Sequence, residues 1–127
     1  MSPGAQALRA RYVSDSVTTA SPARLLTMLY DRLVLDLRQA EGALRGADAE
    51  RADGLLRHAQ DIILELYGSL KPDLWEPAAG LGQLYLYLLS ELAMANVRRD
   101  AERVATARQL LEPLQDAWHQ AAAQLSS

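Results

Sequence analysis

Residues 21–46 carry the strongest helical signal in the chain and read SPARLLTMLYDRLVLDLRQAEGALRG. The hydroxyl of Ser21 can accept a hydrogen bond from a free N–H at a helix start, and Pro22 at the first helical position loses only a donor that has no partner there. Apolar side chains then recur every three or four positions, which is the spacing of one helix face. They are Leu25, Leu29, Leu33, Leu37, Ala40 and Leu44. Gly46 ends this helix, and further apolar residues beside the stripe indicate more than one packing neighbour.

The same spacing predicts three further helices along the chain. Asp48 or Asp53 can cap the second helix. Pro72 and Pro77 mark a connection whose second half becomes the first turn of the third helix, and Asp100 can cap the fourth. The stripe of the fourth helix consists of Val104, Ala107, Leu111, Leu114, Trp118, Ala121 and Leu125.

Two residues are expected to shape the connections and the last helix. Trp75, in the connection before the third helix, is predicted to anchor that loop. Pro113 falls inside the apolar stripe of the fourth helix, where it removes one backbone hydrogen bond and crowds the carbonyl of Gln109, at a cost of about 3 kcal/mol. We therefore predict a kink near residues 109 to 113.

Four helices with short connections predict an all-α fold, an antiparallel up-and-down four-helix bundle with a short N-terminal arm. Residues 1–20 are expected to be a flexible arm, because apolar residues such as Tyr12 and Val17 are too sparse there to form a packed face. Residues 21–127 are expected to form one helical-bundle domain. A chain of 127 residues is long enough to bury a single core.

The composition excludes several kinds of partner and site. The formal net charge is −3, from 13 basic and 16 acidic residues, so the chain has no excess of cations with which to bind a phosphate backbone. It has no cysteine, which excludes disulfides and thiolate metal ligands. The longest uncharged run, residues 77–90, is shorter than the roughly 20 residues of a membrane span, and the N-terminus lacks the apolar core of a secretory signal. We expect a cytoplasmic protein with no nucleic-acid partner and no membrane insertion.

Patterns for catalysis or metal binding are missing from the sequence. A di-metal centre in a four-helix bundle needs two Glu-x-x-His pairs, but His58 has no carboxylate three residues before it, and Asp116 with His119 forms a single pair. The glycines at 80 and 82 follow no strand, and the serines at 14, 16, 21, 69 and 90 have no histidine and carboxylate near them in the sequence. We expect no catalytic residue, no metal and no cofactor. A helical-bundle enzyme is the second class considered, and metal analysis of the purified protein would reveal it.

Short motifs in a fixed order run from Tyr12 to Trp118. They are Tyr12, Ser16–Val17, Thr19–Ala20–Ser21–Pro22, Leu29–Tyr30–Asp31, Leu84–Tyr85–x–Tyr87, Leu92–x–x–Ala95–Asn96 through Asp100, and Ala117–Trp118. Each motif alone is common, but the ordered series across most of the chain is hard to obtain by chance. Together these motifs resemble the FliS family, the flagellar export chaperones that bind flagellin.

The resemblance implies an antiparallel helical bundle that binds the disordered C-terminal segment of flagellin, which folds into helices while wrapping the chaperone. It also implies that the complex stays in the cytoplasm until the flagellar export gate receives it, so that premature polymerisation is prevented. No cofactor or nucleotide is implied.

Helices one and three have more apolar surface than a bundle of this length needs, for example in residues 33–35 and 84–89. Under the resemblance this surplus is expected to form a groove, because only extensive apolar burial offsets the ordering of a disordered segment. The expected partner-binding residues are Ile63, Tyr67, Leu81, Tyr85, Leu88 and Leu89 in the groove, with Tyr12 and Val17 in the arm. One alternative is that these side chains are ordinary core residues. Another is a generic helical adaptor that binds an amphipathic helix of a different secretion substrate or regulator.

Overall fold

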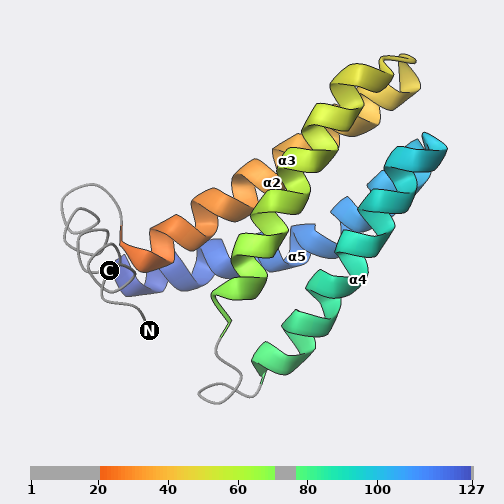
Figure 1. Cartoon of the computed structure of the whole chain (residues 1–127). Coiled ribbons are helices and arrows are strands. Elements are labelled where there is room, and N and C mark those ends of the chain that lie inside the picture. Colours follow the sequence, from red (N-terminus) through yellow and green to blue (C-terminus); the bar gives the residue numbers. More distant parts are fainter. Residues whose placement is uncertain (1–20, 71–76, 127) are drawn as a thin grey trace, which may run out of the picture.

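The computed structural model describes residues 21–70 and 77–126, and this part of the chain contains four helices and no strand. The helices are α2 (Pro22–Arg45), α3 (Ala49–Gly68), α4 (Pro77–Arg98) and α5 (Ala101–Ser126). The α2–α3 and α4–α5 connections lie at the same end of the molecule, so successive helices are antiparallel (Figure 1). The predicted all-α, up-and-down four-helix bundle is confirmed. The predicted arm, residues 1–20, and Trp75 lie outside the described residues.

Capping residues predicted from the sequence start the helices. The side chains of Ser21, Asp48 and Asp100 each accept a hydrogen bond from the backbone N–H three residues later, at 3.1, 3.2 and 3.1 Å. Of the two candidate caps for the second helix, Asp48 is therefore the cap, and Asp53 lies inside α3. Gly46 follows the last residue of α2 as expected, and its N–H donates to a carbonyl of the last turn at 3.0 Å.

Each helix packs against two others, so the four helices surround one core. α2 and α4 lie on opposite sides, and each contacts both α3 and α5. The largest fully buried side chains include leucines from all four helices and two tyrosines, Tyr30 and Tyr85. The hydroxyl oxygens of these tyrosines are 2.5 Å apart across the core. Burial raises the pKa of both phenols, so both stay neutral and hydrogen-bonded.

Ion pairs hold the middle of α5 against α2. The best shielded pair joins Arg108 to Glu41 at 2.5 and 3.2 Å, and these side chains are only 17% and 12% exposed. Glu112 accepts a second bond from Arg108 at 2.8 Å and also pairs with Arg38 across the interface. These four charged side chains are therefore paired within the chain.

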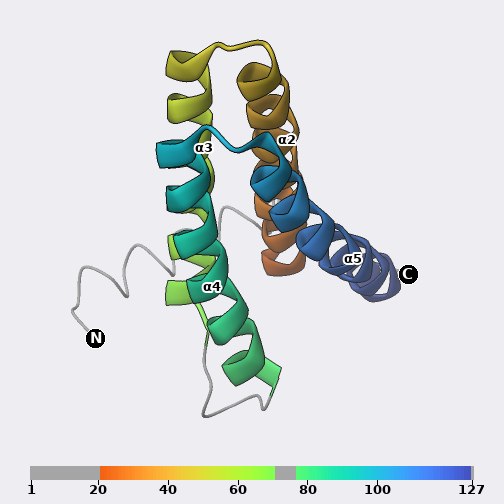
Figure 2. The same ribbon diagram turned by 90° about the vertical axis from the view of Figure 1, so that its right-hand side faces the viewer.

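Pro113 lies inside α5, and this helix is bent. Its C-terminal half stays beside α2 but turns away from α4 in both views (Figure 1, Figure 2). A bend is the expected effect of a proline, which cannot donate to the carbonyl of Gln109. Pro113 was expected within the apolar stripe, but its side chain is exposed. The buried position in that turn is occupied by Leu111.

Candidate functional site

The surface where α3 meets α4 is the candidate binding site. One row of side chains follows α3 at intervals of three or four residues, and a second row follows α4 in the same way. Rows with this spacing stay on one face along the length of a helix. We name these two rows the α3–α4 seam. It consists of Asp53, Arg57, Gln60, Leu64 and Tyr67 on α3, and of Gly82, Leu86, Leu89, Ala93 and Val97 on α4.

Two hydrogen bonds connect the helices along the seam. The amide of Gln60 donates to the backbone carbonyl of Leu89 at 3.4 Å, near the middle. The amide of Asn96 donates to the carboxylate of Asp53 at 2.7 Å, near one end. Because the first bond joins the two rows directly and the second joins Asp53 to the neighbour of Val97, the two rows lie side by side along the helices.

Large apolar side chains along the seam remain in contact with solvent. Leu64 is 53% exposed, Tyr67 40%, Leu86 50% and Val97 79%. A single exposed leucine is ordinary in a soluble protein, but a row of them on two adjacent helices is typical of a surface that binds a partner.

One end of the seam contains an apolar hollow of about 450 Å³. Tyr67 and Leu70 line it from α3 and the following turn, and Ala78, Gly82 and Leu86 line it from α4. Gly82 is buried, and a Cβ at this position would lie 3.5 Å from Tyr67 Cε2 and 3.6 Å from Leu70 Cδ1. These are ordinary contact distances for a Cβ, and the atoms of a larger side chain would extend toward Tyr67 and Leu70, which line the hollow. The glycine therefore leaves the hollow open.

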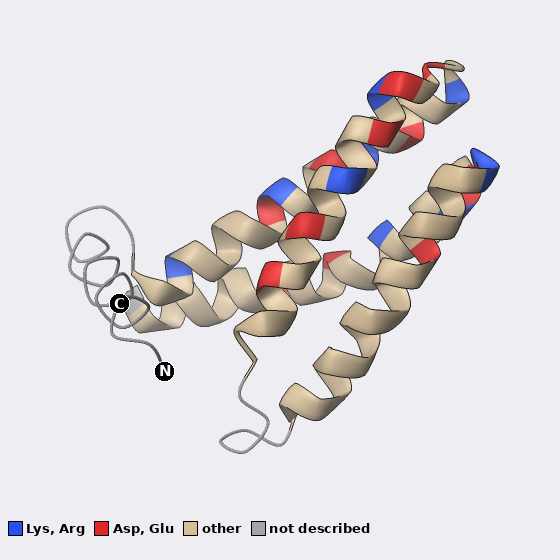
Figure 3. Cartoon of the chain, viewed as in Figure 1, with Lys and Arg blue, Asp and Glu red and all other residues tan. Residues whose placement is uncertain are grey.

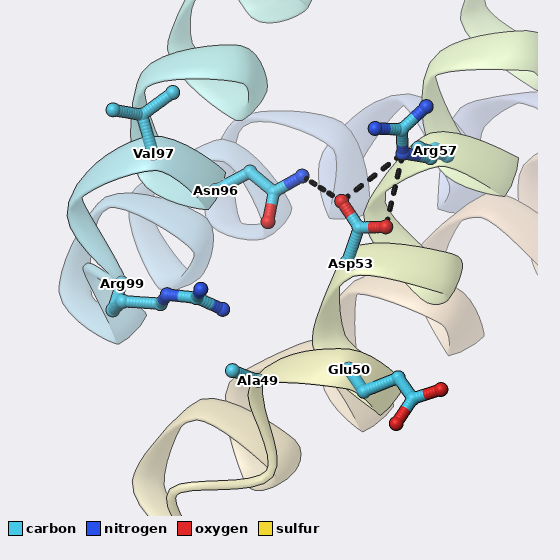
Figure 4. Close-up of a pocket in the computed structure, with 7 residues that line it drawn as sticks. All are labelled: Ala49, Glu50, Asp53, Arg57, Asn96, Val97 and Arg99. Carbon is cyan, nitrogen blue, oxygen red and sulfur yellow. Dashed lines mark hydrogen bonds and ion pairs between the residues drawn. The ribbon is translucent and has the colours of Figure 1, made fainter.

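The opposite end of the seam contains a polar pocket of about 580 Å³ (Figure 4). Asp53 lies within it and accepts hydrogen bonds from Asn96 at 2.7 Å and from Arg57 Nε at 3.0 Å to each carboxylate oxygen. The bond from Asn96 lowers the pKa of Asp53 most, and the bond from Arg57 lowers it further. Asp53 is therefore ionised and already paired at neutral pH.

Charged residues are scarce on the α4 side of the seam. Between Pro77 and Arg98, α4 contains only Glu91 and Arg98 as charged residues. Figure 3 shows α4 almost entirely in the colour of uncharged residues, whereas the other three helices carry charges at several positions. An apolar partner helix could therefore lie on α4 without burying many charges.

Three of the predicted groove residues belong to the core. Ile63, Tyr85 and Leu88 have exposed fractions of 0%, 2% and 0%. They face the centre of the bundle, where they pack with buried side chains from the other helices. In this arrangement a partner reaches them only if the bundle opens.

The other predicted residues have different positions. Tyr67 and Leu89 lie in the seam, whereas Leu81 is partly buried and packs against the core. Tyr12 and Val17 lie outside the described residues. Whether any of these side chains binds a partner stays a prediction.

Sequence reasoning missed Leu64, Gly82, Leu86 and Val97 as residues of the candidate site. The sequence does contain a signal for Val97, because Leu86, Ala93 and Val97 recur at helical spacing. In the structure all three are exposed on α4. A helix with apolar residues on all sides has one more apolar face than a single core can bury. Nothing in the sequence shows that Gly82 lies opposite Tyr67, because that proximity arises only when the helices pack.

Other candidate chemistries have no support in residues 21–70 and 77–126. No group of three His, Asp or Glu side chains in these ranges is placed to hold a metal ion. None of the helices found there combines the length and the apolar character of a membrane span. Asp36 is a fully buried carboxylate, but it pairs with Arg32 at 3.1 Å and with His58. Its role is therefore internal, in an ion pair with Arg32 within α2 and a polar contact with His58 that links α2 to α3.

Known proteins resemble this chain over nearly its whole length. The family described as "Flagellar protein FliS" matches residues 4–125. The flagellar secretion chaperone FliS of Bacillus subtilis is 36% identical over 110 residues, which are 87% of this chain and 82% of that protein. The one of Salmonella typhimurium is 33% identical over 113 residues, which are 85% of this chain and 82% of that protein. A crystal structure described as a flagellar chaperone from bacteria superimposes with a TM-score of 0.75 at 25% identity, and the match covers 96% of this chain and 99% of that one.

Proposed function

Because this chain belongs to the FliS family of flagellar secretion chaperones, we propose that it binds the disordered C-terminal segment of flagellin and prevents premature polymerisation. The complex then stays in the cytoplasm until the flagellar export gate receives it. The family is one of chaperones and not of enzymes, so the protein acts by binding. The proposed contact surface is the α3–α4 seam, with Tyr12 and Val17 as further contacts.

The exposed apolar rows of the seam are the observation that supports this proposal most. Leu64, Tyr67, Leu86 and Val97 are all at least 40% exposed, and two of them, Tyr67 and Leu86, line the hollow. Moving a large apolar side chain fully out of water contributes about 1.5–3 kcal/mol. Several such side chains together can offset the conformational entropy that a disordered segment loses when it becomes ordered.

The geometry of the seam favours a helical form of the bound segment. The two rows follow adjacent helices, and the ridge of an amphipathic helix fits between the ridges of such a pair. A bound helix would present apolar residues at intervals of three and four residues to the same rows. The hollow beside Gly82 would receive the largest of these side chains.

Filling the hollow tests the proposed surface. Gly82→Leu places a side chain where the partner is expected to insert one, so affinity for a peptide from the C-terminus of flagellin should fall at least about tenfold, or about 1.4 kcal/mol. Removing a glycine from a helix contributes roughly 0.5–1 kcal/mol to stability, and crowding against Tyr67 and Leu70 opposes this gain, so the free energy of unfolding should change by less than about 2 kcal/mol. Isothermal titration gives the affinity, and thermal unfolding gives the stability. Binding of the wild type should also show a negative heat-capacity change, which accompanies apolar burial.

Gly54→Leu is the matched control. Gly54 lies on the exposed side of α3, no atom lies within 4 Å of the position its Cβ would take, and it lines neither the hollow nor the polar pocket. This variant should bind the peptide as the wild type does. Equal binding by both leucine variants would show that the partner does not use the hollow, and no binding of the peptide by the wild type would refute the proposed function.

The alternative function, a generic adaptor for amphipathic helices, would use the same apolar seam. A competitor peptide with the same apolar spacing but an unrelated sequence distinguishes the two. A flagellin chaperone should bind the flagellin segment at least about tenfold more tightly than this competitor, whereas an adaptor should bind both within about threefold. The adaptor function would replace our proposal if the two affinities matched.

A further inference from the structure

Arg99 extends over the polar pocket from the end of α4. It is the first residue after that helix and has a φ of 57°, in the left-handed region. Ala47, just after α2, has a φ of 59°, so this conformation is a feature of helix ends and not in itself a sign of function. At Arg99 this backbone conformation directs the side chain, so the guanidinium points from the end of α4 toward the first turn of α3 (Figure 4).

The guanidinium of Arg99 forms no hydrogen bond or ion pair with the acidic residues of the pocket, and its charge acts on Asp53 only at a distance. Asp53 is engaged by Asn96 and Arg57, and the charge of Arg99 is the last of the influences on Asp53. The carboxylate of Glu50 points away from Arg99 (Figure 4). Within residues 21–70 and 77–126, Arg99 has no hydrogen bond and no ion pair, so its N–H donors are available to a ligand.

We infer that this pocket binds the terminal carboxylate of the segment that lies on the seam, so that the bound helix ends beside Arg99. The inference rests on the proposed function and adds the direction of the partner. The C-terminal end of a helix carries unpaired carbonyl groups and a partial negative charge, and a chain terminus adds a full one. A guanidinium can donate to both, and it would repel the positive end of a helix in the opposite direction.

The distance between the two ends of the seam sets the length of the bound helix. Gly82 and Asn96 on α4, like Tyr67 and Asp53 on α3, are roughly 14 residues apart, which in a helix is about 21 Å. A partner helix alongside advances by the same amount per residue. A large apolar side chain in the hollow therefore lies about 14 residues before the carboxylate that reaches Arg99.

The charge of the terminus provides the first test. Two peptides from the C-terminus of flagellin, one with a free carboxylate and one with a terminal amide, are titrated at low ionic strength into the wild type and into Arg99→Gln. Amidation should weaken binding to the wild type about threefold to tenfold, as expected for a charge-assisted contact at a partly exposed site. Arg99→Gln should weaken binding of the free acid by a similar factor and hardly change binding of the amide.

Arg98→Gln is the matched control, because Arg98 is exposed, precedes Arg99 and does not line the pocket. It should not distinguish the two peptides. Equal affinity of the wild type for acid and amide, or equal losses for both peptides in Arg99→Gln, would overturn the inference and leave the proposed function intact. Failure of both peptides to bind the wild type would remove the proposed function and this inference together.

A second test reports the direction of the helix. The chain has no cysteine, so Arg98→Cys and Gly80→Cys each introduce one site for a nitroxide label, near the polar pocket and near the hollow respectively. The label at position 98 should broaden the NMR signals of the last residues of a bound, isotope-labelled peptide. The label at position 80 should broaden the signals of peptide residues about four turns earlier. If the label at position 80 broadened the last residues of the peptide instead, the inference would be contradicted.

Discussion

The α2–α5 interface and the α3–α4 seam lie on different sides of one bundle and are held in different ways. Across α2–α5, Arg38 pairs with Glu112 and Arg108 with Glu41, and Asp31 accepts from Gln115 at 2.9 Å. Across the described part of α3 and α4, hydrogen bonds from Gln60 and Asn96 are the polar links. The first interface is joined by charges, and the second mainly by apolar packing.

This difference bears on which side is available to a partner. A partner could bind the paired charges of α2 and α5 only after separating them. Separation would leave a buried charge without its partner, which destabilises the fold. Along the seam, exposed apolar side chains such as Leu86 and Val97 have no such internal partners to give up. The α2–α5 side can therefore remain fixed while the seam binds.

The largest effect is expected at the shielded ion pair of the α2–α5 interface. Arg108→Met leaves the carboxylate of Glu41, only 12% exposed, without its guanidinium. We expect the free energy of unfolding to fall by about 2–3 kcal/mol, less than for a fully buried pair. Urea denaturation measures this loss. Replacing both partners, with Glu41→Gln and Arg108→Met together, should restore part of it because no unpaired charge is left.

Arg45→Met is the control for this prediction on the same interface. Arg45 pairs with Glu102 at 3.0 Å, but the two side chains are 53% and 82% exposed. Solvent screens such a pair, so the loss should be under about 0.5 kcal/mol. Similar losses for the two methionine variants would show that the shielding of Arg108 and Glu41 does not matter.

The next effect is expected on binding and compares exposed leucines from the two regions. Leu86→Asp places a charge on the seam, and its affinity for the flagellin peptide should fall at least about tenfold, because a partner would have to desolvate that charge. Leu35→Asp makes the same change on α2, where Leu35 is 41% exposed and outside the seam. It should change affinity less than about twofold. If Leu35→Asp weakened binding as strongly, the partner would not be confined to the seam.

The sequence was sufficient for the helices because the signals involved are local. A cap such as Ser21 acts on an N–H three residues away, and a helical stripe repeats every three or four residues. The start of α2, the cap Asp100 and the order of four helices could therefore be predicted without tertiary information.

The same reasoning could not sort the apolar residues of α4 into core and surface. Leu84 to Leu89 are apolar at every position, so periodicity does not single out one face. Tyr85 and Leu88 turn inward and Leu86 turns outward, and only the packing of the neighbouring helices decides this. Contacts such as Asn96 with Asp53, or Arg108 with Glu41, join residues far apart in the chain and have no local signal.

The smallest effect concerns one exposed carboxylate from each region. Partial burial would raise the pKa of Asp31, but hydrogen bonds from His119 and Gln115 and the positive charge of His119 outweigh it, so the pKa lies below 3.8. The pKa of Asp53 is also lowered, first by Asn96 and then by Arg57. A lowered pKa means that the unfolded chain takes up a proton first as pH falls, so each contribution is present above about pH 4 and is lost as pH falls through the folded pKa.

Near pH 5, Asp31→Asn and Asp53→Asn should therefore each have a slightly lower free energy of unfolding than the wild type. These losses should shrink toward about pH 3, where the wild type also loses the contribution. Urea denaturation across this range measures both, with the wild type as reference at each pH. Because both carboxylates are exposed, the two variants should behave alike although they lie in different regions. A loss at Asp31 as large as that of Arg108→Met would mean that exposed charges also hold α2 against α5. If Asp31→Asn and Asp53→Asn both cause only small losses of stability, the difference between the α2–α5 interface and the α3–α4 seam comes from the shielded pair of Arg108 and Glu41.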